Sequence, residues 1–274
     1  MRIDFCRRPA HALSIMSFVV ATAFAAPAQA ETDEELAMQL SNPVAALISV
    51  PFQLNYEQDI GSARGGERWL LNVQPVVPFD LNAEWNLISR TILPVVRQDE
   101  IFPGAGRQSG IGDIVQSVFF SPKAPTAGGV IWGAGPVFLL KTGSNDLLTT
   151  DKWGAGPTGV VIKQQGPWTV GALANHIWSF AGNDDRADIS ASFLQPFLTY
   201  TTPTATTFSL NLESTYDWNN RQWSVPINVG VSQILRIGGQ LVQVGAVARH
   251  WAEGPDQGPH GWGLRLNFTL LFPR

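Results

Sequence analysis

The stretch that decides the fold is Gly261–Phe272, GWGLRLNFTLLF, which ends two residues before the C-terminus. Side chains of a β-strand point alternately to opposite faces. One face of this stretch is entirely apolar and the other mostly polar; the apolar face carries Trp262, Leu264, Leu266, Phe268, Leu270 and Phe272. Such a strand, with aromatic residues at both ends, is typical of the closing strand of an outer-membrane β-barrel. A half-buried strand of a soluble sandwich is the alternative.

Twelve strand-like segments follow one another from residue 47 onward. They span approximately residues 47–57, 67–79, 82–96, 110–121, 128–141, 151–164, 167–181, 188–201, 205–217, 222–236, 239–252 and 261–272. Short connections alternate with mostly longer polar ones, as in an even-stranded meander with short periplasmic turns and longer outer loops. The pattern predicts an all-β fold, a transmembrane antiparallel up-and-down β-barrel of about 12 strands over residues 47–274.

Residues 1–30 have the features of a signal peptide. A basic start precedes an apolar run from Leu13 to Ala26, and Ala28-Gln29-Ala30 is a small-x-small cleavage site. The run is too short for the ~20 residues of a membrane-spanning helix. Because Cys6, the one cysteine, precedes the cleavage site, the mature chain would have no disulfide.

The mature chain is acidic. Cleavage leaves 274 − 30 = 244 residues, with 18 − 3 = 15 basic and 22 − 1 = 21 acidic side chains, a net charge of −6. An acidic chain lacks the basic face that nucleic acid requires. The mean hydropathy of +0.03 fits a barrel wall in which lipid-facing and lumen-facing residues average out.

Residues 31–46 differ from the strands that follow them. Leu36, Leu40, Val44 and Leu47 recur at helical spacing, and Asn42-Pro43 interrupts the pattern. We expect a short helical or irregular segment that is either a periplasmic tail or a plug in the lumen.

Nine tryptophans lie at the ends of predicted strands. Those beside the outer loops are Trp69, Trp153, Trp178, Trp218, Trp223, Trp251 and Trp262, and those beside inner turns are Trp85 and Trp168. Tryptophan prefers the membrane interface, where its ring is half buried and its N–H meets water. We expect these residues to form the aromatic girdles of the barrel.

Assignment of faces predicts a partly charged lumen. Arg or Lys on the lipid face near the midplane costs about 2–4 kcal/mol, so ionisable residues are assigned inward. The candidate lumen-lining residues are Glu84, Asn86, Arg90, Asn211, Glu213, Asp217, Arg249, Arg265 and Asn267. They either select solutes or form an ion-pair network that knits the interior. Twelve strands enclose a lumen between filled small barrels and open porins, so we expect a narrow one.

Two features do not fit simple alternation. Segments 167–181 and 188–201 are apolar on both faces, which indicates a packed interior or a path for an apolar solute. The motif Gly-x-Gly-Pro occurs at residues 133–136 and again at 154–157. Because a closed barrel has no free edge, prolines inside its strands should mark bulges or bends.

Several motifs resemble those of a known family. They are Asn42-Pro43-Val44, LISVPFQ at 47–53, WNLISRT at 85–91, GIGD at 110–113, KWGAGP at 152–157 and GWGLR at 261–265. These motifs resemble a transporter family of proteobacterial outer-membrane β-barrels, related to the phenol-degradation meta-pathway proteins and in part mislabelled neuromedin U. The resemblance implies uptake or export of small, aromatic or apolar compounds. It carries over no catalytic residues.

Catalytic and metal sites are not predicted. A serine hydrolase needs a serine beside a histidine that an Asn or acid orients. Asn175 and His176 are adjacent on a strand and therefore point to opposite faces. The acidic loop 183–188 lacks the alternating ligands and central glycine of a calcium loop. We expect no enzyme activity, no metal and no cofactor, although a Ser–His contact near the outer rim would reopen the question.

The predicted function is passage of small solutes, aromatic or apolar ones included, across the cell outer membrane. The alternatives are a structural or surface-interaction barrel with a blocked lumen and an outer-membrane lipid-modifying enzyme. The expected partners are outer-membrane lipid and lipopolysaccharide, the barrel-assembly machinery through the C-terminal strand, and a small-molecule solute.

Overall fold

The computed structural model describes residues 31–273, and the predicted signal peptide lies outside them. The elements are α1 (Asp33–Leu40), β1 (Ile48–Ile60), β2 (Gly66–Val73), β3 (Val76–Asp80), β4 (Trp85–Asp99), β5 (Arg107–Ile111), β6 (Ile114–Pro122), β7 (Val130–Leu140), β8 (Lys152–Gln165), β9 (Trp168–Gly182), β10 (Ser190–Thr201), β11 (Thr206–Leu212), β12 (Ser214–Asp217), β13 (Gln222–Ile237), β14 (Gln240–Glu253) and β15 (Gly261–Phe272). Within the described part, no helix has the length and apolar character needed to cross a membrane.

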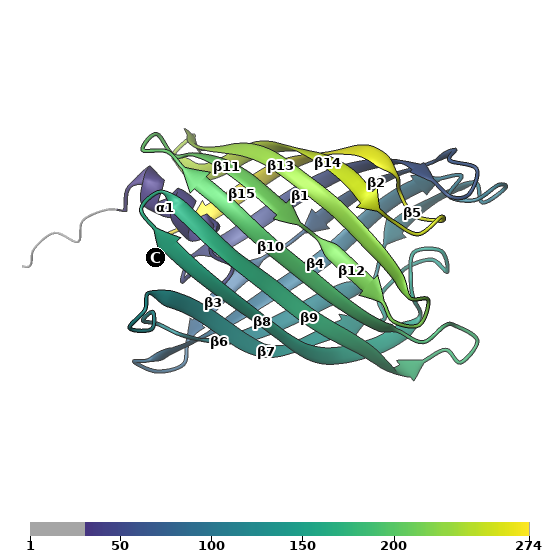
Figure 1. Cartoon of the computed structure of the whole chain (residues 1–274), viewed down its shortest axis with the longest axis horizontal. Helices are drawn as coiled ribbons and strands as arrows, with labels where there is room; N and C mark the ends of the chain where they lie inside the picture. Colours follow the sequence, from purple (N-terminus) through teal and green to yellow (C-terminus); the bar gives the residue numbers. More distant parts are fainter. Residues whose placement is uncertain (1–30, 274) are drawn as a thin grey trace, which may run out of the picture. The chain divides into compact units, whose positions relative to one another are not determined.

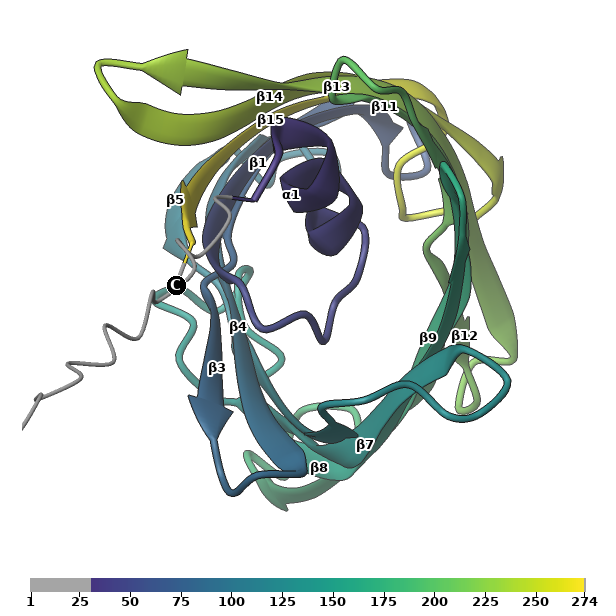
Figure 2. The ribbon, with the colours of Figure 1, turned by 90° about the vertical axis from the view of Figure 1, so that its left-hand side faces the viewer.

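The fifteen strands make twelve spanning strands, because three of these are each interrupted once. The interruptions fall at Gln74-Pro75 between β2 and β3, at Gly112-Asp113 between β5 and β6, and at Glu213 between β11 and β12. Every neighbouring pair is antiparallel, and β15 pairs with β1 from Ile48↔Phe272 to Tyr56↔Leu264. This last pairing closes the barrel, seen end-on in Figure 2. The predicted antiparallel barrel of twelve strands is confirmed.

Connections at the two ends of the barrel differ as the sequence predicts. At the end where α1 and the C-terminus lie, they span residues 81–84, 123–129, 166–167, 202–205 and 238–239 (Figure 1). At the other end they span residues 61–65, 100–106, 141–151, 183–189, 218–221 and 254–260. By the rule for outer-membrane barrels, the end that holds both termini is periplasmic.

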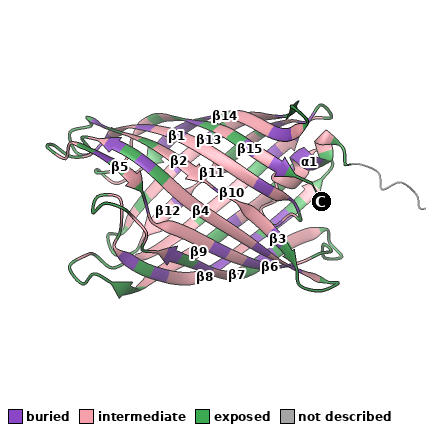
Figure 3. Ribbon diagram, turned by 180° about the vertical axis from the view of Figure 1, so that it is seen from behind, coloured by how far each residue is buried: buried purple, intermediate pink, exposed green. Residues whose placement is uncertain are grey.

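Exposure alternates along the strands (Figure 3). In β15, Trp262 is 62% exposed and Leu266 48%, whereas Arg265 between them in the pattern is only 5% exposed. An apolar side chain that remains exposed on a regular strand faces lipid in a transmembrane barrel, and the buried polar face lines the lumen.

One side of the lumen is filled by apolar side chains. Val44 of the N-terminal segment packs with residues of β4, β6, β8 and β9, namely Ile88, Phe119, Val160, Ile162 and Leu173. Phe193 and Phe197 of β10 pack against this cluster. The apolar inner faces of residues 167–181 and 188–201 therefore serve a packed interior.

The Gly-x-Gly-Pro motifs face each other on β7 and β8. Pro136 pairs with Pro157, and the register continues unchanged on both sides. On the far side of each proline, towards β6 and β9, the bridges are interrupted. The β8–β9 register also shifts between Trp153 and Gly154, at the start of the second motif. Pro226 lies at a further register shift, so these prolines do mark irregularities in the strand pairing, as predicted.

Candidate functional site

A hydrogen-bonded network of charged side chains lines one wall of the lumen. Arg265 donates from both terminal nitrogens to the two carboxylate oxygens of Glu213, at 2.7 and 2.8 Å. Arg249 lies beside them, with Nη2 3.3 Å from Glu213 Oε2. Residue 213 sits at the break between β11 and β12, where its backbone nitrogen donates to Pro226 O at 3.2 Å and its side chain reaches both arginines.

Asparagines complete the coordination of the two guanidinium groups. Asn55 Oδ1 accepts from Arg249 Nη1 and from Arg265 Nε, both at 2.6 Å. Asn228 Oδ1 accepts from Arg249 Nε at 2.9 Å, and its amide nitrogen donates to Asn211 Oδ1. Asn55 and Asn228 are fully buried, and a buried charge is tolerated only where its donors are satisfied in this way.

The network continues to the neighbouring strands β1 and β2. Glu57 is 3% exposed, accepts from Arg68 Nε at 2.8 Å and pairs with Arg249 at 3.2 Å. Sequence reasoning missed Asn55 and Glu57. The signal was present, because Gln53, Asn55 and Glu57 alternate with Phe52, Leu54 and Tyr56 in β1.

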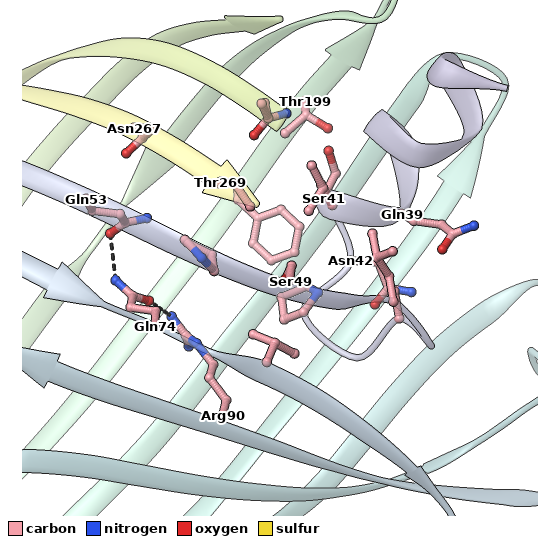
Figure 4. A pocket seen from close by; sticks show the side chains of 18 of the residues that line it. Gln39, Ser41, Asn42, Ser49, Gln53, Gln74, Arg90, Thr199, Asn267 and Thr269 are labelled. Atoms are coloured by element: carbon pink, nitrogen blue, oxygen red, sulfur yellow. Dashed lines mark hydrogen bonds between the residues drawn. The ribbon is translucent and has the colours of Figure 1, made fainter. Parts of the chain in front are cut away.

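Arg90 lies apart from these ion pairs, nearer the periplasmic end. Its Nη2 donates to Gln74 Oε1 at 2.9 Å, and Gln74 Nε2 donates to Gln53 Oε1 at 2.7 Å. Among residues 31–273, no carboxylate forms an ion pair with Arg90. Figure 4 shows this chain of polar groups at the edge of a cavity of about 240 Å³. Asn211 and Asn267, both predicted to line the lumen, border the same cavity.

The N-terminal segment forms the floor of that cavity. Figure 2 shows α1 inside the ring of strands at one end of the barrel. Leu36 and Ala37 are buried against barrel residues, among them Ile234, Leu241 and Leu271. Thr32 caps the helix and exchanges hydrogen bonds with Glu35 in a capping box, which fixes its first turn.

Polar contacts tie α1 to the wall at two points. Asp33 forms an ion pair with Arg236 of β13 at 2.7 Å, and Gln164 of β8 donates to Met38 O at 2.9 Å. The helix therefore contacts separate strands around the mouth. Residues 39–47 continue from it into the cavity lining.

At the other end, the loop 141–151 folds towards the lumen. Asp113 accepts from the backbone nitrogens of Thr142, Gly143 and Thr150, at 3.1, 3.0 and 2.6 Å. Gln98 on the inner face of β4 donates to Leu147 O at 3.2 Å. The break between β5 and β6 at Gly112-Asp113 thus provides the carboxylate that holds this loop.

Three predicted lumen residues lie near the barrel ends. Glu84 is exposed in the periplasmic turn 81–84, so its predicted lumen position is wrong. The strand begins only at Trp85, because Asn82 Oδ1 accepts from the backbone nitrogens of residues 84 and 85 and holds the turn. Asn86 is buried, 7% exposed, near the same end of β4. Asp217 lies at the outer rim and accepts from Asn219 and Asn220 in the turn.

Eight of the nine girdle tryptophans are exposed or half-buried at strand ends, and Trp251 is the exception. Trp251 is 7% exposed and faces the lumen, where its ring lies 4.9 Å from the Arg249 guanidinium carbon. Residues 249 and 251 share a face, which sequence reasoning overlooked. Gly263 opposite leaves room for the ring, since a Cβ there would lie 2.9 Å from Trp251 Cζ3. Trp132, not predicted, stacks edge-on against Trp85.

A serine–histidine contact occurs on the lipid-facing side near the outer rim. His176 Nδ1 lies 2.7 Å from Ser192 Oγ, and Trp218 Nε1 donates to the same Oγ at 2.9 Å. The other imidazole nitrogen lies 3.5 Å from Ser190 Oγ. Asn175 faces the lumen, so within the described chain no amide or acid orients the histidine. Within residues 31–273, no cluster of three or more metal-ligating side chains occurs.

Comparison with known proteins finds similarity in fold to solved outer-membrane proteins. No family model and no curated protein matches the chain. The chain is similar to the COG4313 outer membrane channel from Pseudomonas putida F1, with a TM-score of 0.64 and 15% identity over 83% of this chain and 96% of that chain. An outer membrane phospholipase of Salmonella typhi gives a TM-score of 0.48 and 12% identity over 87% and 96%.

The similarity to the COG4313 channel supports the fold of an outer-membrane β-barrel. At 15% identity it does not transfer a solute or a reaction, so the function rests on the lumen itself.

Proposed function

We propose that the protein is an outer-membrane channel that passes small polar or amphipathic solutes and is closed at its periplasmic end by residues 31–46. The observation that carries this proposal is a closed barrel whose lumen has a charged wall, an apolar wall and a floor formed by an N-terminal segment that adds no strand to the barrel. A barrel that served only as a scaffold would gain more stability from an apolar interior, because buried ion pairs are often no better than packed hydrophobic groups.

The floor is suited to displacement. It consists of the 8-residue helix α1 and the irregular residues that follow it, and it contributes no strand to the barrel. Its apolar contacts are made by Leu36 and Ala37 of the helix and by Val44, and the two polar ties of the helix are peripheral. Removing it would leave the hydrogen-bonded ring of strands complete, which is the property required of a plug.

Single-channel conductance of the refolded mature protein in a planar bilayer tests this proposal. We expect the form lacking residues 31–46 to conduct steadily and more strongly than residues 31–274. Leu36→Asp places a charge in the apolar cluster and should release the helix, giving a conductance close to that of the deletion. Glu34→Gln on the same helix is the matched control and should behave as the wild type.

If neither the full chain nor the deletion conducts, the lumen is blocked by more than the N-terminal segment. The structural or surface-interaction barrel would then replace the channel.

The contact between His176 and Ser192 favours a second candidate, a lipid-modifying hydrolase at the outer membrane surface. A histidine within hydrogen-bonding distance of a serine is the first requirement of such chemistry. The hydrolase is supported less well, because the indole of Trp218 also binds Ser192 Oγ and, within residues 31–273, no carboxylate or amide contacts the imidazole of His176. A fluorophosphonate probe should leave Ser192 unlabelled; labelling that is lost in Ser192→Ala would favour the enzyme.

A further inference from the structure

We infer that the cavity above α1 is a binding site for a small organic carboxylate that also carries a hydroxyl group, with Arg90 as the anchor for the carboxylate. This inference rests on the proposed channel function and specifies its solute class. It follows from the charge of the lining, from two buried oxygens without partners and from the size of the cavity.

Arg90 is the one charged side chain that lines this cavity in the described chain. Within residues 31–273 its one hydrogen bond is to the Gln74 carboxamide, and no carboxylate pairs with it. A guanidinium has five N–H donors in a planar fork that matches a carboxylate. The other lumen arginines, Arg249 and Arg265, have their donors engaged by Glu213 and Asn55. Glu213 attracts Arg90 electrostatically but makes no direct contact with it, so Arg90 is the cavity cation whose N–H donors are available to a ligand anion.

Two oxygens on the opposite part of the lining have no partner. Thr199 Oγ1 and Asn267 Oδ1 are both inaccessible to solvent and make no hydrogen bond within the described chain. Figure 4 shows both residues bordering the cavity across from Arg90. A buried polar atom without a partner costs about 1–3 kcal/mol. If the Asn267 carboxamide turns so that Oδ1 faces the cavity, a ligand hydroxyl that donates to it would relieve that cost, which is why the ligand should carry a donor as well as an anion.

The remaining lining limits the size and character of the ligand. Phe197, Pro51 and Val76 contribute apolar surface between the polar groups. The volume is about 240 Å³, whereas an engineered protein cavity of about 150 Å³ holds benzene. A substituted benzene ring with one carboxylate and one hydroxyl meets all three conditions. 4-Hydroxybenzoate is therefore the probe of choice, and 4-hydroxybenzamide is its uncharged isostere.

Isothermal titration of the purified mature protein in detergent tests the site. The wild type should bind 4-hydroxybenzoate at least about tenfold more tightly than 4-hydroxybenzamide, because a charge-assisted bidentate pair replaces a neutral hydrogen bond. Arg90→Gln should remove this preference and leave amide binding unchanged, and Arg90→Lys should keep part of it. Arg97→Gln, which alters an exposed arginine on the same strand as Arg90 but outside the cavity lining, is the matched control and should bind as the wild type.

The hydroxyl contact has its own test. Asn267→Leu should weaken binding of 4-hydroxybenzoate but not of benzoate. Equal binding of the acid and the amide to the wild type, or wild-type affinity in a folded Arg90→Gln protein, would overturn the inference. So would the absence of any heat with 4-hydroxybenzoate. If Arg90→Gln does not fold, comparing the binding of 4-hydroxybenzoate and 4-hydroxybenzamide to the wild type still tests whether the site prefers the carboxylate.

Failure of the site and failure of the channel are distinguishable, because binding is measured without a membrane and conductance without the probe. Binding without conductance would keep the site and reject the channel. Conductance without binding would keep the channel and reject the site.

Discussion

At the scale of single residues, Glu213 holds the charged wall together. Its carboxylate is the acceptor for two arginines, and its side chain is only 18% exposed. Without it, Arg265 would lose its ion-pair partner, and Arg249 on the neighbouring strand β14 would keep only Glu57, which leaves two adjacent positive charges with one carboxylate. Burial gives such charges little solvent screening, so their repulsion acts at close to full strength.

We therefore expect Glu213→Gln to lower the free energy of unfolding by about 3–5 kcal/mol, the usual cost of removing one partner of a buried ion pair. Guanidinium unfolding of the refolded protein in lipid vesicles, followed by tryptophan fluorescence, measures this difference. Glu253→Gln at an exposed strand end is the control and should shift the midpoint little. An unchanged midpoint in Glu213→Gln would mean that the ion pairs contribute nothing net to stability.

At the scale of elements, the outer loops are tied to one another by charged contacts. Lys152 at the start of β8 is almost fully buried, and its Nζ reaches Asp188 of the loop 183–189 at 2.9 Å. Ser179 Oγ donates to the same carboxylate at 3.1 Å. These hydrogen bonds, with that of Lys152 first, lower the pKa of Asp188 below its ordinary value of 3.8.

This lowered pKa predicts the direction of a pH effect on the loop. A depressed folded-state pKa gives a stabilisation that is complete above pH 3.8 and is lost as the pH falls through the folded-state pKa. Limited proteolysis with pepsin should therefore cut the loop 183–189 faster once the pH falls below the folded-state pKa of Asp188, because the protonated carboxyl no longer holds Lys152. Asp188→Asn should already show the faster cleavage at the highest pH that pepsin tolerates. Equal cleavage of both proteins throughout would contradict a role for the pair.

At the scale of the whole molecule, charge is segregated between the lumen and the rest. Residues 31–274 have a net charge of −6, yet the lumen set of Arg68, Arg90, Arg249 and Arg265 against Glu57 and Glu213 gives 4 − 2 = +2. A narrow path with low-dielectric walls amplifies the effect of such an excess on permeating ions.

The channel opened by deletion of residues 31–46 should accordingly prefer anions. The reversal potential measured across a KCl gradient should have the sign expected when chloride permeates more readily than potassium. Arg90→Gln in the deletion background should move that potential towards zero, and raising the salt should weaken the effect by screening. A cation-selective reversal potential would show that charges outside this set control permeation.

The barrel architecture could be predicted closely from the local sequence pattern, whereas the arrangement of side chains in the lumen could be predicted only in part. Alternation along β15 and the regular change of loop length determine twelve strands, because strand faces and turn positions depend on near neighbours in the chain. Arg90, Arg249 and Arg265 face inward for the same reason. Glu84 was misplaced because a hydrogen-bonded turn runs to residue 84, whereas the alternation pattern places the start of the strand at residue 82.

The sequence by itself determined the barrel, its orientation and which residues of each regular strand share a face. Only the tertiary structure decided which of those residues meet. Glu57 and Arg249 are 192 residues apart and become neighbours only because β15 closes on β1. The seat of α1 on β13 and β14, the place of Trp251 against Arg249 and the solitary position of Arg90 likewise depend on register and closure. Local alternation determines whether a side chain points to the lipid or to the lumen. Which side chains then meet in the lumen depends on the complete ring of strands.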